Sequence, residues 1–301
     1  MSDSIFRKDG TAQGVAKQRL IESLAAEDKR VIYDPYAEKF VLGAGITKLM
    51  GHKLNVWISS KLAPGFHEHL IARTRFIDDL VERSAEGEVD QYVILGAGYD
   101  LRAHRLRLPA SLKIFEVDQL EVQQRKRAIL DKGLPNFENV TYVDVDFNRQ
   151  TLKEQLLGAG FDPNRPTLFT LEGVSQYITK EAVSSTLEEL AALTPSAKAL
   201  FFISYVDRDL KENPEACFGK GYPNPQKKAE TIQQLSARVG EPWITFYSAQ
   251  EMEEMLSKYG FTRVENKTLS DLNSKYFAPV GRALPENHLF NLEHFVVAKK
   301  G

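Results

Sequence analysis

The spacing of apolar residues changes once along the chain, near residue 88. Before that point, apolar residues recur at helical intervals, as at Leu20 and Leu24. Asp34 is a typical N-cap residue, and Pro35 after it suits the first position of a helix. Residues 1–88 are therefore expected to form an all-helical N-terminal cap.

Short apolar runs rich in β-forming residues follow from residue 89 onward, as expected for strands that are buried on both faces. Helical stretches separate the first five runs, and this alternation predicts a doubly wound α/β fold with a parallel sheet. Two further runs near the end of the chain predict a terminal antiparallel pair. The expected strands are 91–95, 112–117, 140–143, 167–171, 199–205, 261–265 and 293–298.

Helix caps and one insertion complete the expected fold. Thr179 is expected to cap a helix that ends at Leu193, and residues 248–251 (SAQE) have the pattern of a capping box. Residues 207–240 are polar, contain three prolines and interrupt the alternation, so we expect an inserted lid there. We expect one structural domain, in which the cap and the lid have no hydrophobic core of their own and a Rossmann-like domain occupies residues 89–301.

Composition and charge narrow the class of protein. The 301 residues are 43% hydrophobic and have a formal net charge of -2, which is typical of a globular protein and lacks the cationic excess of nucleic-acid binding. Cys217 is the one cysteine and cannot form an intrachain disulfide, which fits a reducing compartment. No signal-peptide pattern and no apolar stretch of about 20 residues occurs, so we expect a cytoplasmic protein that does not bind membranes.

A glycine-containing loop follows the first expected strand, at residues 95–100 (LGAGYD). Glycines let the backbone turn tightly and approach a ligand at the carboxyl edge of a parallel sheet. The third glycine of a dinucleotide fingerprint is absent, because Ala103 stands near its place. The loop by itself fits either a cofactor site or a simple turn from strand to helix.

Acidic residues close the next three strands. Asp118 follows Gly98 by twenty residues, a position where a carboxylate accepts hydrogen bonds from both ribose hydroxyls of a nucleoside. The alternative is that Asp118 only caps the next helix. Asp146, with Phe147 beside it, suits an adenine ring, and the alternative there is a solvated loop acid. Glu172 ends the fourth strand, so these acids together predict a nucleoside-binding edge.

Other chemistries find little support in the sequence. None of the eleven tyrosines has a lysine four residues later, as a short-chain dehydrogenase requires, and no P-loop motif occurs. Residues 67–69 (HEH) lack the i, i+4 histidine pair of a zinc helix, so no metal is expected. His104 is expected to be a packed or solvent-facing helix residue and not a catalytic base.

In this order, the motifs resemble the leucine carboxyl methyltransferase family, in the bacterial branch that includes polyketide carboxyl methyltransferases. The resemblance covers most of the chain. It rests on residues 34–37 (DPYA), 73–79 (RTRFIDD), 95–100 (LGAGYD), 115–119 (FEVDQ), 146–147 (DF), 171–174 (LEGV) with Tyr177, and 240–243 (GEPW).

The resemblance implies a class I methyltransferase fold with a seven-stranded, mostly parallel sheet, and S-adenosyl-L-methionine as the cofactor. By position, Arg73 is expected at the methionine carboxylate, Asp118 at the ribose, Asp146 at the adenine and Glu172 near the methionine amino group. The full set of implied cofactor residues is Lys17, Arg73, Gly96, Ala97, Gly98, Asp118, Gln119, Asp146, Phe147 and Glu172.

The chemistry of methyl transfer favours one acceptor. A sulfonium methyl group is already activated, so the enzyme has to align the acceptor atom at about 3–3.5 Å and exclude water. A carboxylate is ionised at neutral pH and needs no general base. We therefore expect an O-methyltransferase acting on a carboxylate of a small molecule, without a predicted catalytic residue.

Several alternatives stay open at this stage. Tyr177, Tyr205 and Tyr222 are candidates for the substrate pocket, and simple packing is the other interpretation of each. Methylation of a hydroxyl or nitrogen on the same scaffold is a second function, and a catalytically inactive nucleoside-binding protein is a third. The sequence predicts neither the identity of the acceptor nor the oligomeric state.

Overall fold

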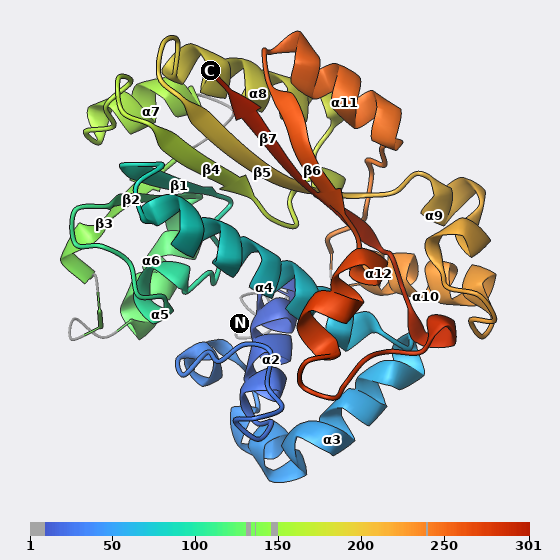
Figure 1. Cartoon of the computed structure of the whole chain (residues 1–301). Coiled ribbons are helices and arrows are strands. Elements are labelled where there is room, and N and C mark those ends of the chain that lie inside the picture. The colour runs from blue at the N-terminus through green and yellow to red at the C-terminus, as the bar shows by residue number, and fades with distance from the viewer. Residues whose placement is uncertain (1–9, 131–133, 136, 146–149, 239) are drawn as a thin grey trace. The chain divides into compact units, whose positions relative to one another are not determined.

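The structure, a computed structural model, describes residues 10–130, 134–135, 137–145, 150–238 and 240–301 (Figure 1). The chain divides into two compact units. The first contains the described residues up to Ile77, together with residues 206–246 and 267–294. The second contains residues 78–205, 247–266 and 295–301.

The sheet that was expected from the sequence forms the centre of the second unit. It has seven strands, and β1 pairs in parallel with β2 and β4, β2 with β3, and β4 with β5. This architecture is the predicted class I, Rossmann-like sheet. In spatial order the strands are β3 (Val140–Asp144), β2 (Lys113–Asp118), β1 (Gln91–Leu95), β4 (Thr167–Leu171), β5 (Ala199–Val206), β7 (Glu293–Lys300) and β6 (Thr262–Lys267).

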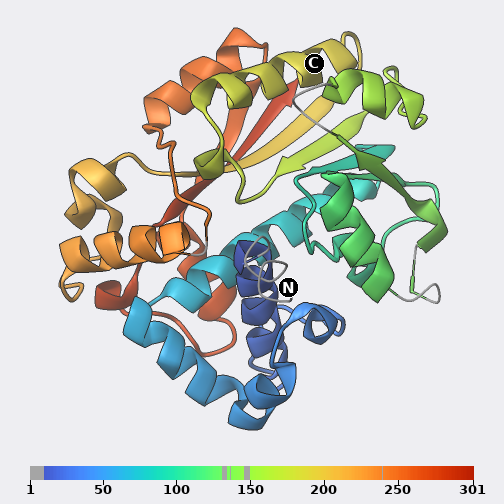
Figure 2. The same cartoon turned by 180° about the vertical axis from the view of Figure 1, so that it is seen from behind.

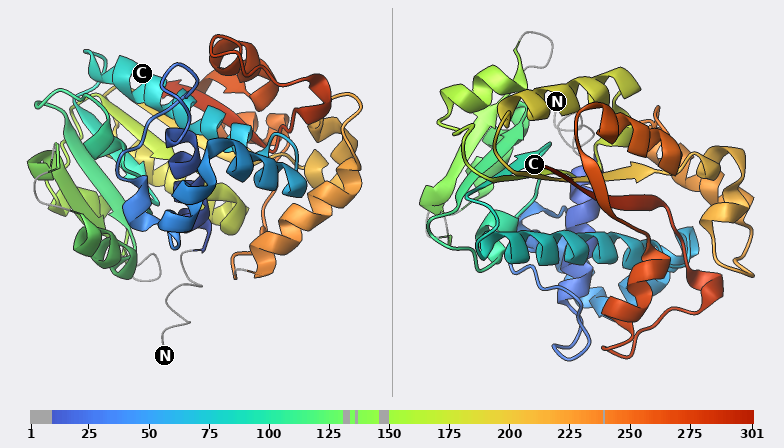
Figure 3. Two further views of the ribbon diagram at one scale, coloured as in Figure 1. Left: turned by 90° about the horizontal axis from the view of Figure 1, so that it is seen from below. Right: turned by 45° about the horizontal axis from the view of Figure 1, so that its top comes forward.

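Helices cover both faces of this sheet, which explains why the strand sequences are continuously apolar. Helices α7, α8 and α11 lie on one face (Figure 3), and alternate strand residues such as Val93 and Leu95 join them in a hydrophobic core. Their neighbours Tyr92 and Ile94 are equally buried on the opposite face. The helices of this unit are α5 (Arg102–Arg105), α6 (Leu120–Ile129), α7 (Leu152–Gly158), α8 (Lys180–Leu193) and α11 (Ala249–Lys258), with short 3-10 turns η2 (Phe137–Asn139) and η3 (Ser175–Tyr177).

The first unit is helical, and its elements come from three separate parts of the chain (Figure 2). Helix α4 (Phe66–Ala85) begins in this unit and ends in the second. The other elements are α2 (Gly10–Ser23), η1 (Ala37–Phe40), α3 (Ala44–Leu62), α9 (Asp209–Glu212), η4 (Pro214–Cys217), α10 (Pro225–Arg238), α12 (Leu269–Leu272), the π-helical turn η5 (Asn273–Phe277) and η6 (Glu286–His288).

A hydrophobic cluster lies inside the first unit. Phe218 stacks on Phe290 with ring centroids 4.6 Å apart, and Tyr222 and Ile232 pack into the same cluster. The sequence led us to expect a cap and a lid without a core of their own. That expectation was wrong, because residues 267–294, which the strand pattern assigned to the sheet domain, supply apolar side chains that complete a core with the inserted segment. The count of one structural domain stays a prediction.

Most expected elements occur at or within a few residues of their predicted bounds. Thr179 caps α8 by accepting a hydrogen bond from Ala182 N, and Ser248 forms the predicted capping box at α11. The helix expected at Asp34 differs. The Asp34 carboxylate accepts hydrogen bonds from the amides of Tyr36 and Ala37, and only a short 3-10 helix follows, from Ala37. The Asp34 side chain thus closes a turn and does not open an α-helix at Pro35.

None of the helices in the described ranges combines the length and the apolar character that crossing a bilayer demands.

Candidate functional site

The carboxyl ends of three strands in the second unit meet at one level of the sheet. The last residue of β1 is in register with Val117 on β2 and with Leu171 on β4. The next residues along the chain are Gly96, Asp118 and Glu172, so the parallel register brings these three predicted residues to one edge. Open α/β sheets bind their ligands at this edge.

The glycine loop can lie close to a ligand because two of its residues adopt positive φ. Gly96 has φ 65° and Gly98 has φ 45°. A Cβ atom at Gly96 would lie 2.7 Å from Cγ2 of Val174, so no side chain fits on that side of the loop. Glycine is therefore required at both positions by the backbone conformation. The loop exposes main-chain atoms, and not side chains, at the edge of the sheet.

Asp118 is fastened to this loop. Gly98 N donates to its Oδ2 at 2.6 Å, and Gln119 N donates to its Oδ1 at 2.7 Å. Helix α6 begins at Leu120 with Gln119 as N-cap, so Asp118 is not the cap that the sequence allowed as an alternative. A carboxylate accepts up to about four hydrogen bonds, and these two contacts are compatible with additional ones from a ribose.

A buried ion pair also connects the end of β2 to the glycine loop. Lys126 of α6 donates to Glu116 Oε2 at 2.6 Å and also to the carbonyl of Asp100 in the glycine loop. Both partners of the ion pair are about 1% exposed or less. Burial raises the pKa of Glu116 to about 7, although the Lys126 ammonium opposes this shift. Lys126 therefore joins the end of β2 to the loop after β1.

Arg102, at the start of α5, gathers three carboxylates around one guanidinium. Its Nη1 lies 2.5 Å from Asp100 and 2.6 Å from Glu172, and its Nε lies 2.8 Å from Asp78. Arg105 makes a second ion pair with Asp78, at 2.5 Å. Burial by itself raises the pKa of Asp78, but the two guanidinium groups hold that pKa below its usual value. The network fixes where Glu172 stands at the sheet edge.

A second contact orders the backbone after Glu172. Gly173 N donates to Ser204 Oγ on β5 at 2.8 Å, and Ser175 Oγ donates to the Ser204 carbonyl at 2.7 Å. The Glu172 side chain stays 16% exposed, whereas its partner Arg102 is almost fully buried. Glu172 is therefore held from one side while it still reaches solvent.

Two predicted cofactor residues belong to the first unit. Arg73 of α4 forms a buried ion pair with Glu293, at 2.5 Å, and His69 lies 3.1 Å from the same carboxylate. Lys17 is exposed on α2. Asp146 and Phe147 lie outside the described residues. The cofactor roles of these four residues stay predictions.

The three candidate pocket tyrosines occupy different parts of the molecule. Tyr205 is fully buried in the core of the second unit, where its ring lies 5.9 Å from that of Tyr247. Tyr222 belongs to the core of the first unit, and its hydroxyl donates to the carbonyl of Pro64 at 2.7 Å. Tyr177 is half-buried on η3. Tyr205 and Tyr222 thus lie in hydrophobic cores, which agrees with the packing role that the sequence left open as an alternative.

His104 behaves as expected for a packed residue. It is 1% exposed, and its Nδ1 lies 3.0 Å from the carbonyl of Pro135. Burial lowers the pKa of this imidazole.

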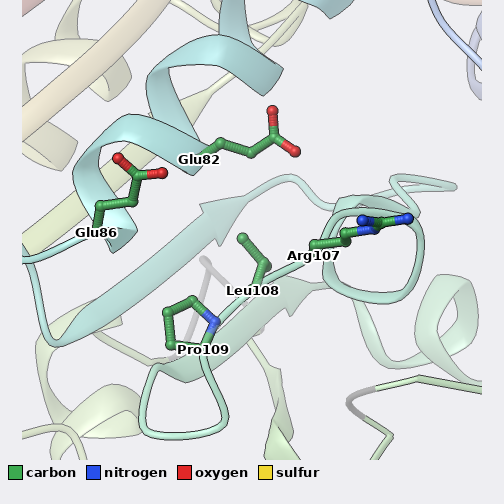
Figure 4. A pocket seen from close by; sticks show the side chains of 5 residues that line it. All are labelled: Glu82, Glu86, Arg107, Leu108 and Pro109. Atoms are coloured by element: carbon green, nitrogen blue, oxygen red, sulfur yellow. The ribbon is translucent and has the colours of Figure 1, made fainter.

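A surface hollow of about 590 Å³ lies elsewhere in the second unit (Figure 4). Its lining residues are Glu82 and Glu86 from α4 and Arg107, Leu108 and Pro109 from the segment after α5. None of the predicted cofactor residues lines it, and it gives no support to the predicted site.

The sequence reasoning missed Arg102 and Lys126, which position the edge without being motif residues themselves. One signal existed for Lys126. Glu116 lies inside an otherwise apolar strand, and a carboxylate buried there requires a cationic or hydrogen-bonding partner. No comparable signal pointed to Arg102, because its partners are spread from Asp78 to Glu172.

An open parallel sheet with glycines and acids at its carboxyl edge defines the class of nucleoside-binding α/β proteins. The sequence model of the leucine carboxyl methyltransferase family matches residues 12–191. The chain belongs to the leucine carboxyl methyltransferase family.

Individual relatives agree with this assignment. A protein of Mycobacteroides abscessus named "Putative S-adenosyl-L-methionine-dependent methyltransferase" is 36% identical over 186 residues, which cover 61% of this chain and 59% of that relative. The similarly named YktD of Bacillus subtilis is 31% identical over 210 residues, 69% of this chain and 66% of its own length. The chain thus matches less than two thirds of the length of these curated relatives.

A solved structure shows the same fold over nearly the whole chain. A DUF574 family protein from Streptomyces avermitilis covers 94% of this chain and 97% of its own, with a TM-score of 0.60 and 15% sequence identity.

Proposed function

We propose that this protein is an S-adenosyl-L-methionine-dependent methyltransferase. The observation that carries the proposal is the register of β1, β2 and β4, which places Gly96, Asp118 and Glu172 at one edge, with Asp118 fastened to the glycine loop. The names of the relatives point to the same cofactor.

The residues at this edge fit an S-adenosyl-L-methionine molecule by their chemistry. Asp118 would hold the ribose hydroxyls, and Gly96, Ala97 and Gly98 would lie along the methionyl and ribose parts. Glu172, which is partly exposed and anionic, suits the methionine ammonium group, because opposite charges strengthen a hydrogen bond. When bound, the cofactor supplies an activated methyl group, and the protein's part is to align an acceptor and exclude water.

We further propose that the acceptor is a carboxylate oxygen of a small molecule. Such a nucleophile is already ionised at neutral pH and needs no base. The one histidine near the glycine loop, His104, is engaged with the Pro135 carbonyl and is buried, which makes it unsuited to deprotonate an acceptor. A hydroxyl acceptor would require such a base.

The Asp118→Ala variant tests cofactor binding directly. Loss of one to two charge-assisted hydrogen bonds of about 1.5–3 kcal/mol each should lower the affinity for S-adenosyl-L-methionine at least tenfold. The melting temperature should fall as well, because the same change removes the bonds from Gly98 N and Gln119 N. Isothermal titration calorimetry measures the affinity, and thermal unfolding measures the stability.

Asp90→Ala is a matched control, since it removes a half-exposed aspartate that precedes the opposite end of β1. The proposal fails if the wild type does not bind the cofactor at about 1 mM, or if both variants bind it equally. Treating the methylated product with mild base identifies the acceptor, because methyl esters hydrolyse and methyl ethers do not.

A further inference from the structure

A buried polar cluster in the first unit has no part in the proposed methyl transfer. Glu22 of α2 is fully buried, and its Oε2 lies 2.9 Å from Nε2 of His67 on α4 and 3.4 Å from Nε2 of His52 on α3. The three potential ligand atoms all lie within 4.8 Å of one another. The sequence separates these residues too widely to suggest a site.

Hydrogen bonds around the cluster orient both His67 and Glu22. Nδ1 of His67 lies 2.8 Å from Oε1 of Gln18, while Oε1 of Glu22 accepts from Val31 N at 2.7 Å. Arg282 donates to both oxygens of Glu22, at 2.6 and 3.0 Å. Burial alone raises the pKa of Glu22, but the imidazole and guanidinium contacts hold it below the usual value.

Two imidazole nitrogens face one oxygen in this cluster. In the tautomer of His67 whose Nδ1 donates to Gln18, Nε2 turns its lone pair toward Oε2 of Glu22. His52 directs a second nitrogen to the same oxygen, and that buried Nε2 makes no hydrogen bond with any residue that the structure describes. Protons on the two imidazoles would satisfy these contacts one pair at a time, whereas a single metal ion can bind both nitrogens and the oxygen together.

The backbone around His52 is built to hold this position. Gly51, with φ 67° and ψ 176°, breaks α3 directly before His52. Asn55 Nδ2 donates to the carbonyls of Gly51 and Thr47, at 2.6 and 2.8 Å, and so satisfies groups that the break frees. The ring of His52 lies 5.8 Å from that of His67, nearly edge-on.

We propose that Glu22, His52 and His67 form a binding site for a divalent transition metal of the zinc type. The ligands of a tetrahedral ion with bonds of about 2.0–2.1 Å lie about 3.3 Å apart, close to the two nitrogen–oxygen separations seen here. The contacts of Gln18 with His67 and of Arg282 with Glu22 are the outer hydrogen bonds that metal ligands require.

The donor set selects the class of metal. Arg282 already neutralises Glu22, so binding depends on the imidazole lone pairs more than on negative charge. Imidazole suits zinc and its transition-metal neighbours, whereas magnesium and calcium prefer oxygen ligands. The site would join α2, α3 and α4, and it goes beyond the methyltransferase proposal because neither the cofactor nor Asp118 takes part.

Metal binding to the whole, tag-free chain tests the proposal. After treatment with a chelator, the wild type should take up one Zn²⁺ per chain in equilibrium dialysis and should develop visible absorption with Co²⁺. The bound ion should raise the melting temperature, and neither Mg²⁺ nor Ca²⁺ should compete. Affinity should fall as the pH drops, because protons compete for the imidazoles.

His52→Gln is the decisive variant, because the side chain is 16% exposed and we expect its replacement to leave the fold intact. It should weaken Zn²⁺ binding at least tenfold, and His67→Gln should do the same. His288→Gln, at an exposed histidine, should bind like the wild type. The site is disproved if the wild type takes up far less than one ion per chain, or if the His52 and His288 variants bind equally. Asp118→Ala should leave Zn²⁺ binding unchanged, which separates this test from that of the methyltransferase.

Discussion

The two units each contain a buried charged cluster, and the clusters have opposite designs. In the second unit, the cation of Arg102 is surrounded by the carboxylates of Asp78, Asp100 and Glu172. In the first unit, the carboxylate of Glu22 is surrounded by the imidazole of His67 and the guanidinium of Arg282. One cluster depends on an arginine that stays charged at any biological pH, and the other includes imidazoles.

The different side chains give the two clusters different roles. Three carboxylates around one arginine have a fixed charge and lie beside the sheet edge, so that cluster can hold Glu172 in place. Imidazoles are common ligands of transition metals, so the cluster around Glu22 has the chemistry to bind the ion that we propose. Burial removes water from both, and for that reason each cluster depends on every one of its partners.

The largest expected effect is on the cluster around Arg102. Arg102→Met leaves three carboxylates near one another without this guanidinium, and removal of one partner from a buried ion pair costs about 3–5 kcal/mol. The free energy of unfolding, measured in urea, should fall by that amount. Arg165→Gln is the control, because its ion pair with Asp90 is exposed and should contribute at most about 1 kcal/mol. Equal losses in the two variants would show that burial does not determine the cost.

A smaller loss is expected in the first unit. Glu22→Gln keeps the shape of the side chain but removes the charge that Arg282 and His67 face, and we expect unfolding to become easier by about 2–3 kcal/mol. The cost stays below that of Arg102→Met because the Arg282 side chain is 16% exposed and can regain water. Glu38→Gln, in an exposed pair with Lys48, is the matched control. If Glu22→Gln lowered the unfolding free energy more than Arg102→Met does, the expected order of the two clusters would be wrong.

The smallest expected effect is a change in how the unfolding free energy depends on pH, through Asp78 of the second unit. Asp78 has a lowered pKa in the folded protein, so below about pH 4 the unfolded chain binds more protons than the folded one. The contribution of ionised Asp78 to the free energy of unfolding is therefore fully present above that pH, and it is lost as the pH falls. Asp78→Asn should flatten the decline of the unfolding free energy between about pH 5 and pH 3. Asp90→Asn should retain the wild-type slope, and an unchanged slope in Asp78→Asn would contradict the assignment.

Local patterns predicted the fold well where they act within one element. The capping residues Thr179 and Ser248 are where the sequence placed them, and β1 and β4 have the predicted bounds. The turn at Asp34 was not predictable in the same way, because one side chain can cap a helix or close a turn. There, Arg19 lies 2.8 Å from the Asp34 carboxylate, a contact that no local pattern contains.

The candidate site was predictable to a similar extent. Asp118 is the last residue of β2, and Gly96 and Glu172 directly follow β1 and β4. A parallel register brings such strand ends together by geometry. The residues that fix them, Arg102 and Lys126, were not found, because their partners lie on other elements.

The sequence by itself determined the alternation of strands and helices, the family, and the positions of the glycines and acids at the strand ends, since these depend on short-range pattern. The tertiary structure alone decided which distant residues share a buried charge. Glu22 and Arg282 are 260 positions apart and still form one ion pair. The physical reason is that a charge removed from water requires a partner in space, and only the folded chain defines which partner is near.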